Sequence, residues 1–105
     1  MDITKHDWKL FQERLPKWQE NHMDRLNREY IELLSSDKPA SVKYWELEKR
    51  INRDKKKAGV QLYLCKKETP FHLAELIAEG AITIEDLDGF NEDLIHKVKS
   101  LVNDE

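Results

Sequence analysis

The feature that most constrains the fold is a long amphipathic stretch that runs from Thr4 to Leu34. Its apolar residues recur every three or four positions, so they would lie along one side of a helix. These residues are Trp8, Phe11, Leu15 and Trp18, with His22 next in line, and then Met23, Leu26, Tyr30 and Leu33 after a slip of one position. Thr4 with Asp7 three residues later is typical of a helix start. The sequence therefore predicts one helix across the first third of the chain.

Pro16 lies within this helix but does not disturb the spacing of its apolar residues. Proline has no N–H to donate to the carbonyl of Gln12, and its ring crowds that carbonyl. We therefore expect a kink at Pro16. The alternative is two helices, with Pro16 in the first turn of the second one.

The length of the predicted helix bears on assembly. At about 1.5 Å per residue it would span roughly 46 Å, whereas a compact domain of about 100 residues has a radius of gyration near 13 Å. Unless the helix bends at Pro16, a second subunit would have to cover the part that overhangs. We therefore expect a homodimer. Its predicted interface consists of Trp8, Phe11, Leu15 and Trp18.

The rest of the chain predicts shorter helices. A second helix is expected from about Ala40 to Lys57, with Gly59 in the left-handed conformation at its end. Its apolar residues form a broad stripe of Val42 and Trp45 beside Tyr44, Leu47 and Ile51. A third helix should begin at Thr69-Pro70, with Thr69 as its cap, and stop at Gly80. One side of it carries Phe71, Ala74, Ile77 and Ala78, with Leu73 and Leu76 close by.

Two more helical segments follow, and one stretch is ambiguous. Thr83 should cap a short turn of residues 83–88, and Asn91 should cap the last helix. Residues 60–65 alternate like a strand, but we favour irregular or helical structure; a short pairing with residues 81–84 is the alternative. The prediction is a single all-α domain over residues 1–105, with a long kinked N-terminal helix packed against a second helix and shorter C-terminal helices.

Charge is distributed in blocks. The net charge is −3, yet residues 38–67 hold ten Lys or Arg and three Asp or Glu, whereas residues 68–96 hold eight Asp or Glu and no Lys or Arg. Adjacent blocks of opposite sign usually form faces that attract each other, either within a subunit or across a dimer.

The densest part of the basic block is the sharpest functional candidate. It consists of Lys49, Arg50, Arg53, Lys55, Lys56 and Lys57. A helix end this basic could contact phosphates, so a nucleic-acid-associated accessory protein is the alternative function. Against it stand an acidic pI of about 5.8, the lack of a recognisable helix-turn-helix partner, and the acidic block as an internal counter-surface.

Several chemistries have no visible basis. Nucleotide-binding glycine motifs and a nucleophile elbow are missing. An EF-hand on Asp86-Leu87-Asp88-Gly89 would place isoleucines at two ligand positions. No histidine pair has H-x-x-x-H spacing, and Cys65 is the only cysteine, which excludes an intrachain disulfide and a cysteine-based zinc site. We therefore expect no catalytic, cofactor or metal site, and no enzyme.

Location and assembly follow from the same residues. No apolar run approaches the roughly 18 residues of a membrane span, and the charged N-terminus does not look like a signal peptide. We expect a small cytoplasmic helical protein that binds other proteins as a regulatory or accessory module and acts as a homodimer.

Four runs carry a resemblance to known proteins: residues 18–20, 30–34, 44–51 and 80–87. They are similar to a family of short Gram-positive bacterial proteins with no assigned activity. Some members of that family carry a transporter label, which the hydropathy of this chain contradicts. The resemblance implies a small cytosolic bacterial protein and no particular chemistry.

Overall fold

The computed structural model describes residues 1–103, and within that range the chain is helical without strands, which confirms the predicted all-α class. In chain order, the elements are α1 (Lys5–Leu34), α2 (Ala40–Asp54), the 3-10 helix η1 (Lys66–Glu68), α3 (Thr69–Ala78), the 3-10 helix η2 (Ile84–Leu87) and α4 (Glu92–Asn103).

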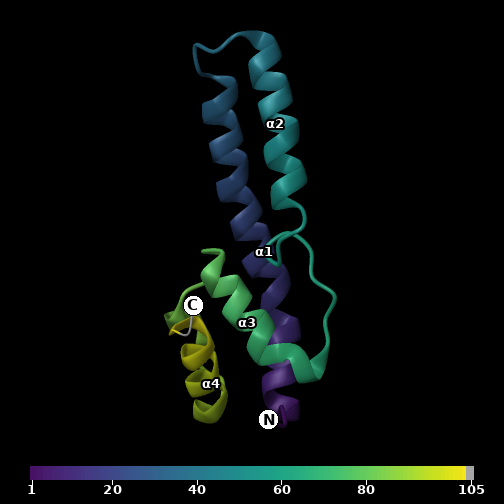
Figure 1. Cartoon of the computed structure of the whole chain (residues 1–105). Coiled ribbons are helices and arrows are strands. Elements are labelled where there is room, and N and C mark those ends of the chain that lie inside the picture. The colour runs from purple at the N-terminus through teal and green to yellow at the C-terminus, as the bar shows by residue number, and fades with distance from the viewer. Residues whose placement is uncertain (104–105) are drawn as a thin grey trace.

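The molecule is elongated because α1 runs along most of its length (Figure 1). Its extents are 52 × 27 × 21 Å. The C-terminal half of α1 pairs with the antiparallel α2, and we call residues 23–54 the hairpin. The N-terminal half of α1 is covered by α3 and α4, and we call residues 1–22 with 58–103 the lobe. The predicted overhang of α1 is thus partly covered by the chain's own α2.

The lobe contains the hydrophobic core. One cluster of buried residues joins α1 to the C-terminal helices: Ile3, Phe11, Leu15, Ala58, Leu73, Leu76, Ala81, Ile82, Leu87, Phe90, Leu94 and Val98. The side of α3 that faces this core carries Leu73 and Leu76, whereas Phe71 is exposed. The side of α3 that faces the core is therefore rotated about the helix axis relative to the predicted one. The prediction was wrong here because α3 has apolar residues nearly all around it.

Helix α1 starts as predicted, and the structure decides between one helix and two helices at Pro16. The Oγ1 of Thr4 accepts a hydrogen bond from the Asp7 backbone N–H at 3.1 Å. The helix continues through Pro16 without ending, so the two-helix alternative is wrong. The Asp7 carboxylate is buried and accepts a hydrogen bond from the Asn91 backbone N–H at 3.1 Å. Asp7 therefore ties the start of α4 to α1.

Several predicted boundaries need correction. Helix α2 ends at Asp54 instead of Lys57, and a series of turns follows. Among the described residues, positive φ occurs only at Gly80 (78°) and Gly89 (96°), so the left-handed Gly59 was a wrong prediction. Thr69 lies inside α3 and its hydroxyl donates to the Lys66 carbonyl, so it does not cap that helix.

Three other local predictions hold. Gly80 ends α3 in the left-handed conformation, and Thr83 forms a capping box with Asp86 at the start of η2. Residues 60–65 are irregular, as favoured, with no strand pairing in the described part of the chain.

Candidate interaction surface

The residues of the predicted dimer interface lie in the lobe, at its centre and margin. Phe11 and Leu15 are buried in the core of the chain itself. Trp8 and Trp18 are half-buried and pack against that core, with each ring centroid 6.4 Å from that of Phe11. Because α3 and α4 cover this part of α1, the expected need for a second subunit at this position disappears.

The predicted basic cluster is divided. Arg50 pairs with Glu46 at 3.1 Å, and Arg53 pairs with Asp54 at 3.0 Å. The remaining members, Lys49, Lys55, Lys56 and Lys57, are exposed, and none of the ion pairs found within residues 1–103 involves them. The structure therefore leaves four of the six cations without an ion pair to the described residues.

The basic and acidic blocks do not pair through their side chains in the part of the chain that the structure describes. The ion pairs there join residues within α1, within the turn and α2, or within α3. The loop that carries residues 55–65 and the helix α4 also lie on opposite sides of α1 (Figure 1). From the acidic block of residues 68–96, the Glu79 carboxylate reaches the basic block and binds backbone N–H groups there.

The hairpin has little core of its own. Leu33 and Asp54 are the only buried residues between residues 23 and 54. Large apolar side chains are exposed along it: Ile31, Leu34, Val42, Tyr44, Trp45 and Ile51. Tyr44 and Trp45 contact each other near the tip, with ring centroids 4.9 Å apart. The hairpin therefore carries most of the large apolar side chains that are exposed to water.

One side of the hairpin seam is apolar. A groove of about 250 Å³ opens there between α1 and α2. Its walls are Met23, Leu26, Asn27, Tyr30, Ile51, Asp54, Lys55 and Val60. Leu34 follows Tyr30 by four positions and Tyr44 precedes Ile51 by seven, so helix geometry places both on this same side. We call this side the apolar face.

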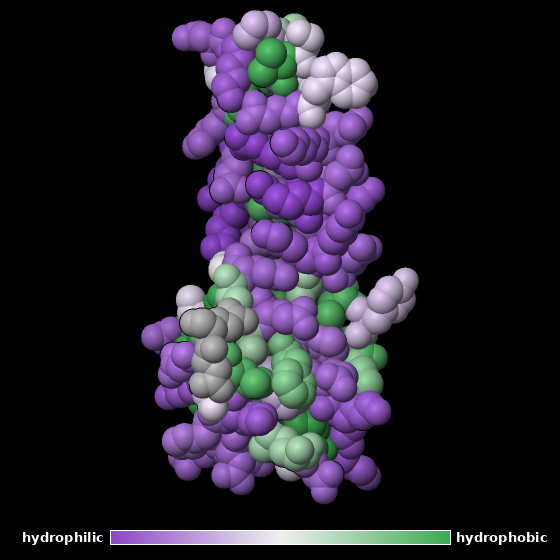
Figure 2. All heavy atoms as spheres, in the orientation of Figure 1, coloured by the Kyte–Doolittle hydropathy of each residue, from purple (hydrophilic) through white to green (hydrophobic). Residues whose placement is uncertain are grey.

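The opposite side of the seam is polar. A groove of about 310 Å³ lies there, at the end of the hairpin nearest the lobe. It is lined by His22, Arg25, Leu26, Glu29, Arg53, Asp54, Lys57, Glu79 and Gly80. The hairpin surface that is visible in Figure 2 is almost entirely hydrophilic between the tip and the lobe. The two sides of one pair of helices thus differ sharply in character.

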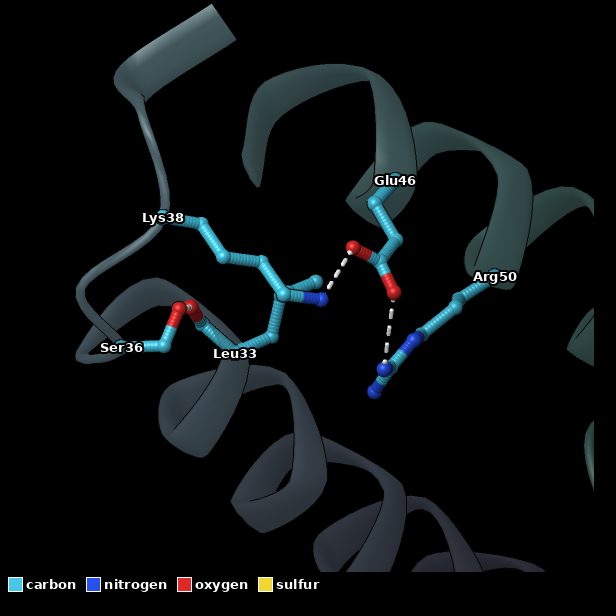
Figure 3. Close-up of polar contacts among 5 residues, drawn as sticks. All are labelled: Leu33, Ser36, Lys38, Glu46 and Arg50. Atoms are coloured by element: carbon cyan, nitrogen blue, oxygen red, sulfur yellow. Dashed lines mark hydrogen bonds and ion pairs between the residues drawn. The ribbon is translucent and has the colours of Figure 1, made fainter. Parts of the chain in front are cut away.

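Ion pairs hold the upper part of the hairpin. Glu46 accepts hydrogen bonds from Lys38 at 2.9 Å and from Arg50 at 3.1 Å (Figure 3). Those two hydrogen bonds lower the pKa of Glu46. The Ser36 hydroxyl donates to the Leu33 carbonyl at 2.7 Å, which closes the turn. The turn and α2 are therefore joined by polar contacts more than by apolar packing.

A buried polar cluster joins the two helices near the base of the hairpin. The Tyr30 hydroxyl donates to one oxygen of Asp54 at 2.5 Å, and Arg53 donates to the other at 3.0 Å. Burial alone would raise the pKa of Asp54, but the hydrogen bonds from Tyr30 and Arg53 outweigh it and the pKa is lowered. Burial, together with the bond to Asp54, raises the pKa of Tyr30 to about 12. Asp54 is therefore ionised and paired at neutral pH.

The hairpin meets the lobe at Ala58 and Gly59. The Glu79 carboxylate accepts from their backbone N–H groups at 3.1 and 3.0 Å. Gln19 donates to the Ala58 carbonyl at 2.9 Å. A Cβ on Gly59 would lie 2.4 Å from the Cδ2 of His22, so only glycine allows this close approach. This junction fixes how the chain leaves α2 and enters the lobe.

His22 lies at the centre of the junction and is itself buried. The Arg25 guanidinium donates to its Nδ1 at 3.2 Å and also to the Gly80 carbonyl. Burial, and then the positive charge of Arg25, lower the pKa of His22 below its ordinary 6.5. The ring is therefore neutral at pH 7, with its Nδ1 acting as an acceptor.

Three further properties bear on function. Residues 1–103 contain no group of three or more His, Cys, Asp or Glu side chains that could hold a metal ion. No helix in this range is both long and apolar enough to cross a membrane. Cys65 is a free, half-buried thiol.

The exposed hairpin is the feature that sequence reasoning missed. Its signal was present in the broad stripe of Tyr44, Leu47 and Ile51 beside Val42 and Trp45. A stripe too wide for one neighbouring helix indicates a second contact surface.

Comparison with protein-family models, curated proteins and solved structures found no match.

Proposed function

We propose that this chain is a cytoplasmic, non-enzymatic protein-binding module, and that the hairpin is its binding element. The observation that carries the proposal is the cluster of exposed apolar residues on a hairpin that projects beyond the core of the lobe. Exposed apolar residues that cluster in one region mark interaction sites, whereas single apolar residues scattered over a surface are normal.

The aromatic pair at the tip adds to this proposal. Tyr and Trp supply much of the binding energy in protein interfaces because they bury a large area with few rotatable bonds. Tyr44 and Trp45 are exposed and contact each other, so a partner could cover both rings together.

Nucleic-acid binding is the second candidate, supported by the four exposed lysines of residues 49–57. These lysines do not all lie on one surface, because Lys55 lines the apolar groove and Lys57 lines the polar one. Phosphate contacts favour cations along a single stripe. A titration of DNA or RNA at about 50 mM salt tests this candidate, and an absence of binding there removes it.

The proposed function can be tested by capture of partners from native cells with a cross-linker. The bait is the wild-type chain or the double variant Trp45→Ala/Ile51→Glu, and the control is Phe71→Ser, which alters an exposed apolar residue of the lobe. We expect the double variant to lose the captured proteins while the control keeps them. Retention by a folded double variant, checked by circular dichroism, would refute the hairpin as the binding element.

A further inference from the structure

The spacing of residues on the apolar face is that of a helical bundle. Met23, Asn27, Tyr30 and Leu34 are separated by four, three and four positions, and Tyr44, Leu47 and Ile51 by three and four. This is the seven-residue repeat of helices that pack side by side in left-handed bundles. Within the apolar stripe Asn27 is the kind of polar residue that fixes the register of such a bundle.

Helix α1 carries a second stripe of the same period. Leu26, Tyr30 and Leu33 lie on the side of α1 that faces α2. A helix with two adjacent stripes contacts two neighbours, as in a four-helix bundle. The structure supplies only one of these neighbours for the C-terminal half of α1, because α3 and α4 cover its N-terminal half (Figure 1).

The apolar face is wide enough for two helices. Ile31 lies next to the α1 stripe on its outer side, Tyr44 is the first member of the α2 stripe, and both are exposed. One helix laid in the groove would touch Leu26, Tyr30 and Ile51, but it would leave Ile31 and Tyr44 in water. Two helices side by side would cover both, since layers of secondary structure pack face to face.

The charges near the groove permit two copies to meet. Of the residues that line it, only Asp54 and Lys55 are charged at neutral pH, and Asp54 is already bonded to Tyr30 and Arg53. A two-fold interface places the same patch on both sides, so an uncharged centre avoids repulsion between like charges. The polar face, with Arg25, Glu29 and Lys57 along its groove, lacks this property.

The area of the face sets the expected strength. Helix α2 is about 22 Å long, and two helices packed about 8–10 Å apart are roughly 20 Å wide. The footprint is therefore roughly 400 Å² per copy, or roughly 800 Å² in total, which is at the low end for specific interfaces. Such a contact suits a weak pair that dissociates on dilution.

We infer that the apolar face binds a second copy of this chain, so that two hairpins form a four-helix bundle. This inference rests on the proposed function and names a second copy of the chain as the first protein that the hairpin binds. It moves the predicted homodimer interface from the buried stripe around Phe11 to the exposed stripes of Met23–Leu34 and Tyr44–Ile51.

Sedimentation velocity from about 1 μM to about 1 mM, the range of weak association, tests the inference. The wild-type mass should rise from the 12.5 kDa of one chain toward twice that value. Ile51→Glu, on the apolar face, should remain monomeric. Val42→Glu is the matched control, since Ile51 and Val42 are both β-branched, lie on α2 and are 41% and 45% exposed, but Val42 does not belong to the apolar face. The control should dimerise like the wild type.

A measurement on the wild type covers the case in which Ile51→Glu does not fold. Amide NMR shifts should change with concentration along the Met23–Leu34 and Tyr44–Ile51 stripes and not in α3 or α4. A chain that stays monomeric to about 1 mM, or a dimer that both variants keep, would overturn the inference. If a monomeric chain still loses its captured proteins in the Trp45→Ala/Ile51→Glu variant, the proposed function stands and only the second copy is excluded.

Discussion

The lobe and the hairpin share one helix but are stabilised in different ways. In the lobe, α1 contributes Phe11 and Leu15 to a core that α3 and α4 close from the other side. In the hairpin, the same helix has a single neighbour and buries only Leu33. A two-layer arrangement removes apolar surface from water, whereas one pair of helices leaves most of it exposed.

Polar contacts compensate in part for the thin packing of the hairpin. The Lys38–Glu46 pair joins the turn to α2, the Arg50–Glu46 pair lies within α2, and the Tyr30–Asp54 bond joins α1 to α2. The ion pairs contribute little free energy because water screens them. We therefore expect the hairpin to open more readily than the lobe.

The largest expected effect separates the two halves of α1. Phe11→Ala, at a residue that is 0% exposed, should lower the free energy of unfolding by about 3–5 kcal/mol, because it removes a core ring and leaves a cavity. Ile31→Ala, at a residue that is 61% exposed, should change it by no more than about 0.5 kcal/mol. Urea unfolding of dilute protein, followed by circular dichroism, measures both values.

A similar loss in the two variants would contradict the comparison, since it would mean that Ile31 is as well packed as Phe11. If Ile31→Ala lowers the free energy of unfolding only in concentrated protein, the contrast between the lobe and the hairpin becomes sharper. In that case a second copy, rather than the chain itself, covers the hairpin.

The next effect concerns the junction of the two regions. Gly59→Ala should destabilise the chain by about 1–3 kcal/mol, since the new methyl group would overlap the ring of His22 and force a shift. In a His22→Ala background the same substitution should cost much less, because the obstructing ring is gone. Urea unfolding of the four proteins in this cycle gives the coupling. An equal cost in both backgrounds would show that the overlap with His22 is not the cause.

Most of the fold could be predicted because its determinants are local. The periodic apolar residues of α1, the Thr4 cap and the Thr83–Asp86 capping box act within a few positions, and the structure contains all of them. Helix α3 shows the limit of periodicity. With apolar residues on nearly all sides, its sequence does not indicate that Leu73 and Leu76, instead of Phe71, face the core.

The contacts that organise the site could not be predicted, because they join distant residues. Asp7 binds the backbone of Asn91, 84 positions away, and Glu79 binds the backbone of Ala58 and Gly59. No local pattern distinguishes a carboxylate that caps a remote segment from one that faces water. For the same reason, an apolar stripe on α2 reveals its period but not whether the chain covers it.

The smallest expected effect is a dependence on pH that originates at the junction. His22 faces Arg25 and Glu29 of α1, Asp54 of α2 and Glu79, the residue that follows α3. Burial and Arg25 lower its folded pKa below 6.5 and outweigh the opposing effect of the three carboxylates. The unfolded chain therefore binds a proton first as the pH falls, and the free energy of unfolding should decrease from about pH 6.5 down to the lowered pKa.

One titrating group limits the slope to about 1.4 kcal/mol per pH unit. His22→Gln should flatten the profile in this window, while the difference from wild type at pH 8 reports only the altered packing of the ring. Urea midpoints at several pH values between about 5 and 8 measure the slope, a range that brackets the ordinary pKa of histidine. If protonation acts by pushing Arg25 away from Gly80, amide exchange should rise first at the junction and in the hairpin, ahead of the lobe core. A wild-type profile as flat as that of the variant, or exchange that rises equally in both regions, would show that His22 does not couple the hairpin to the lobe.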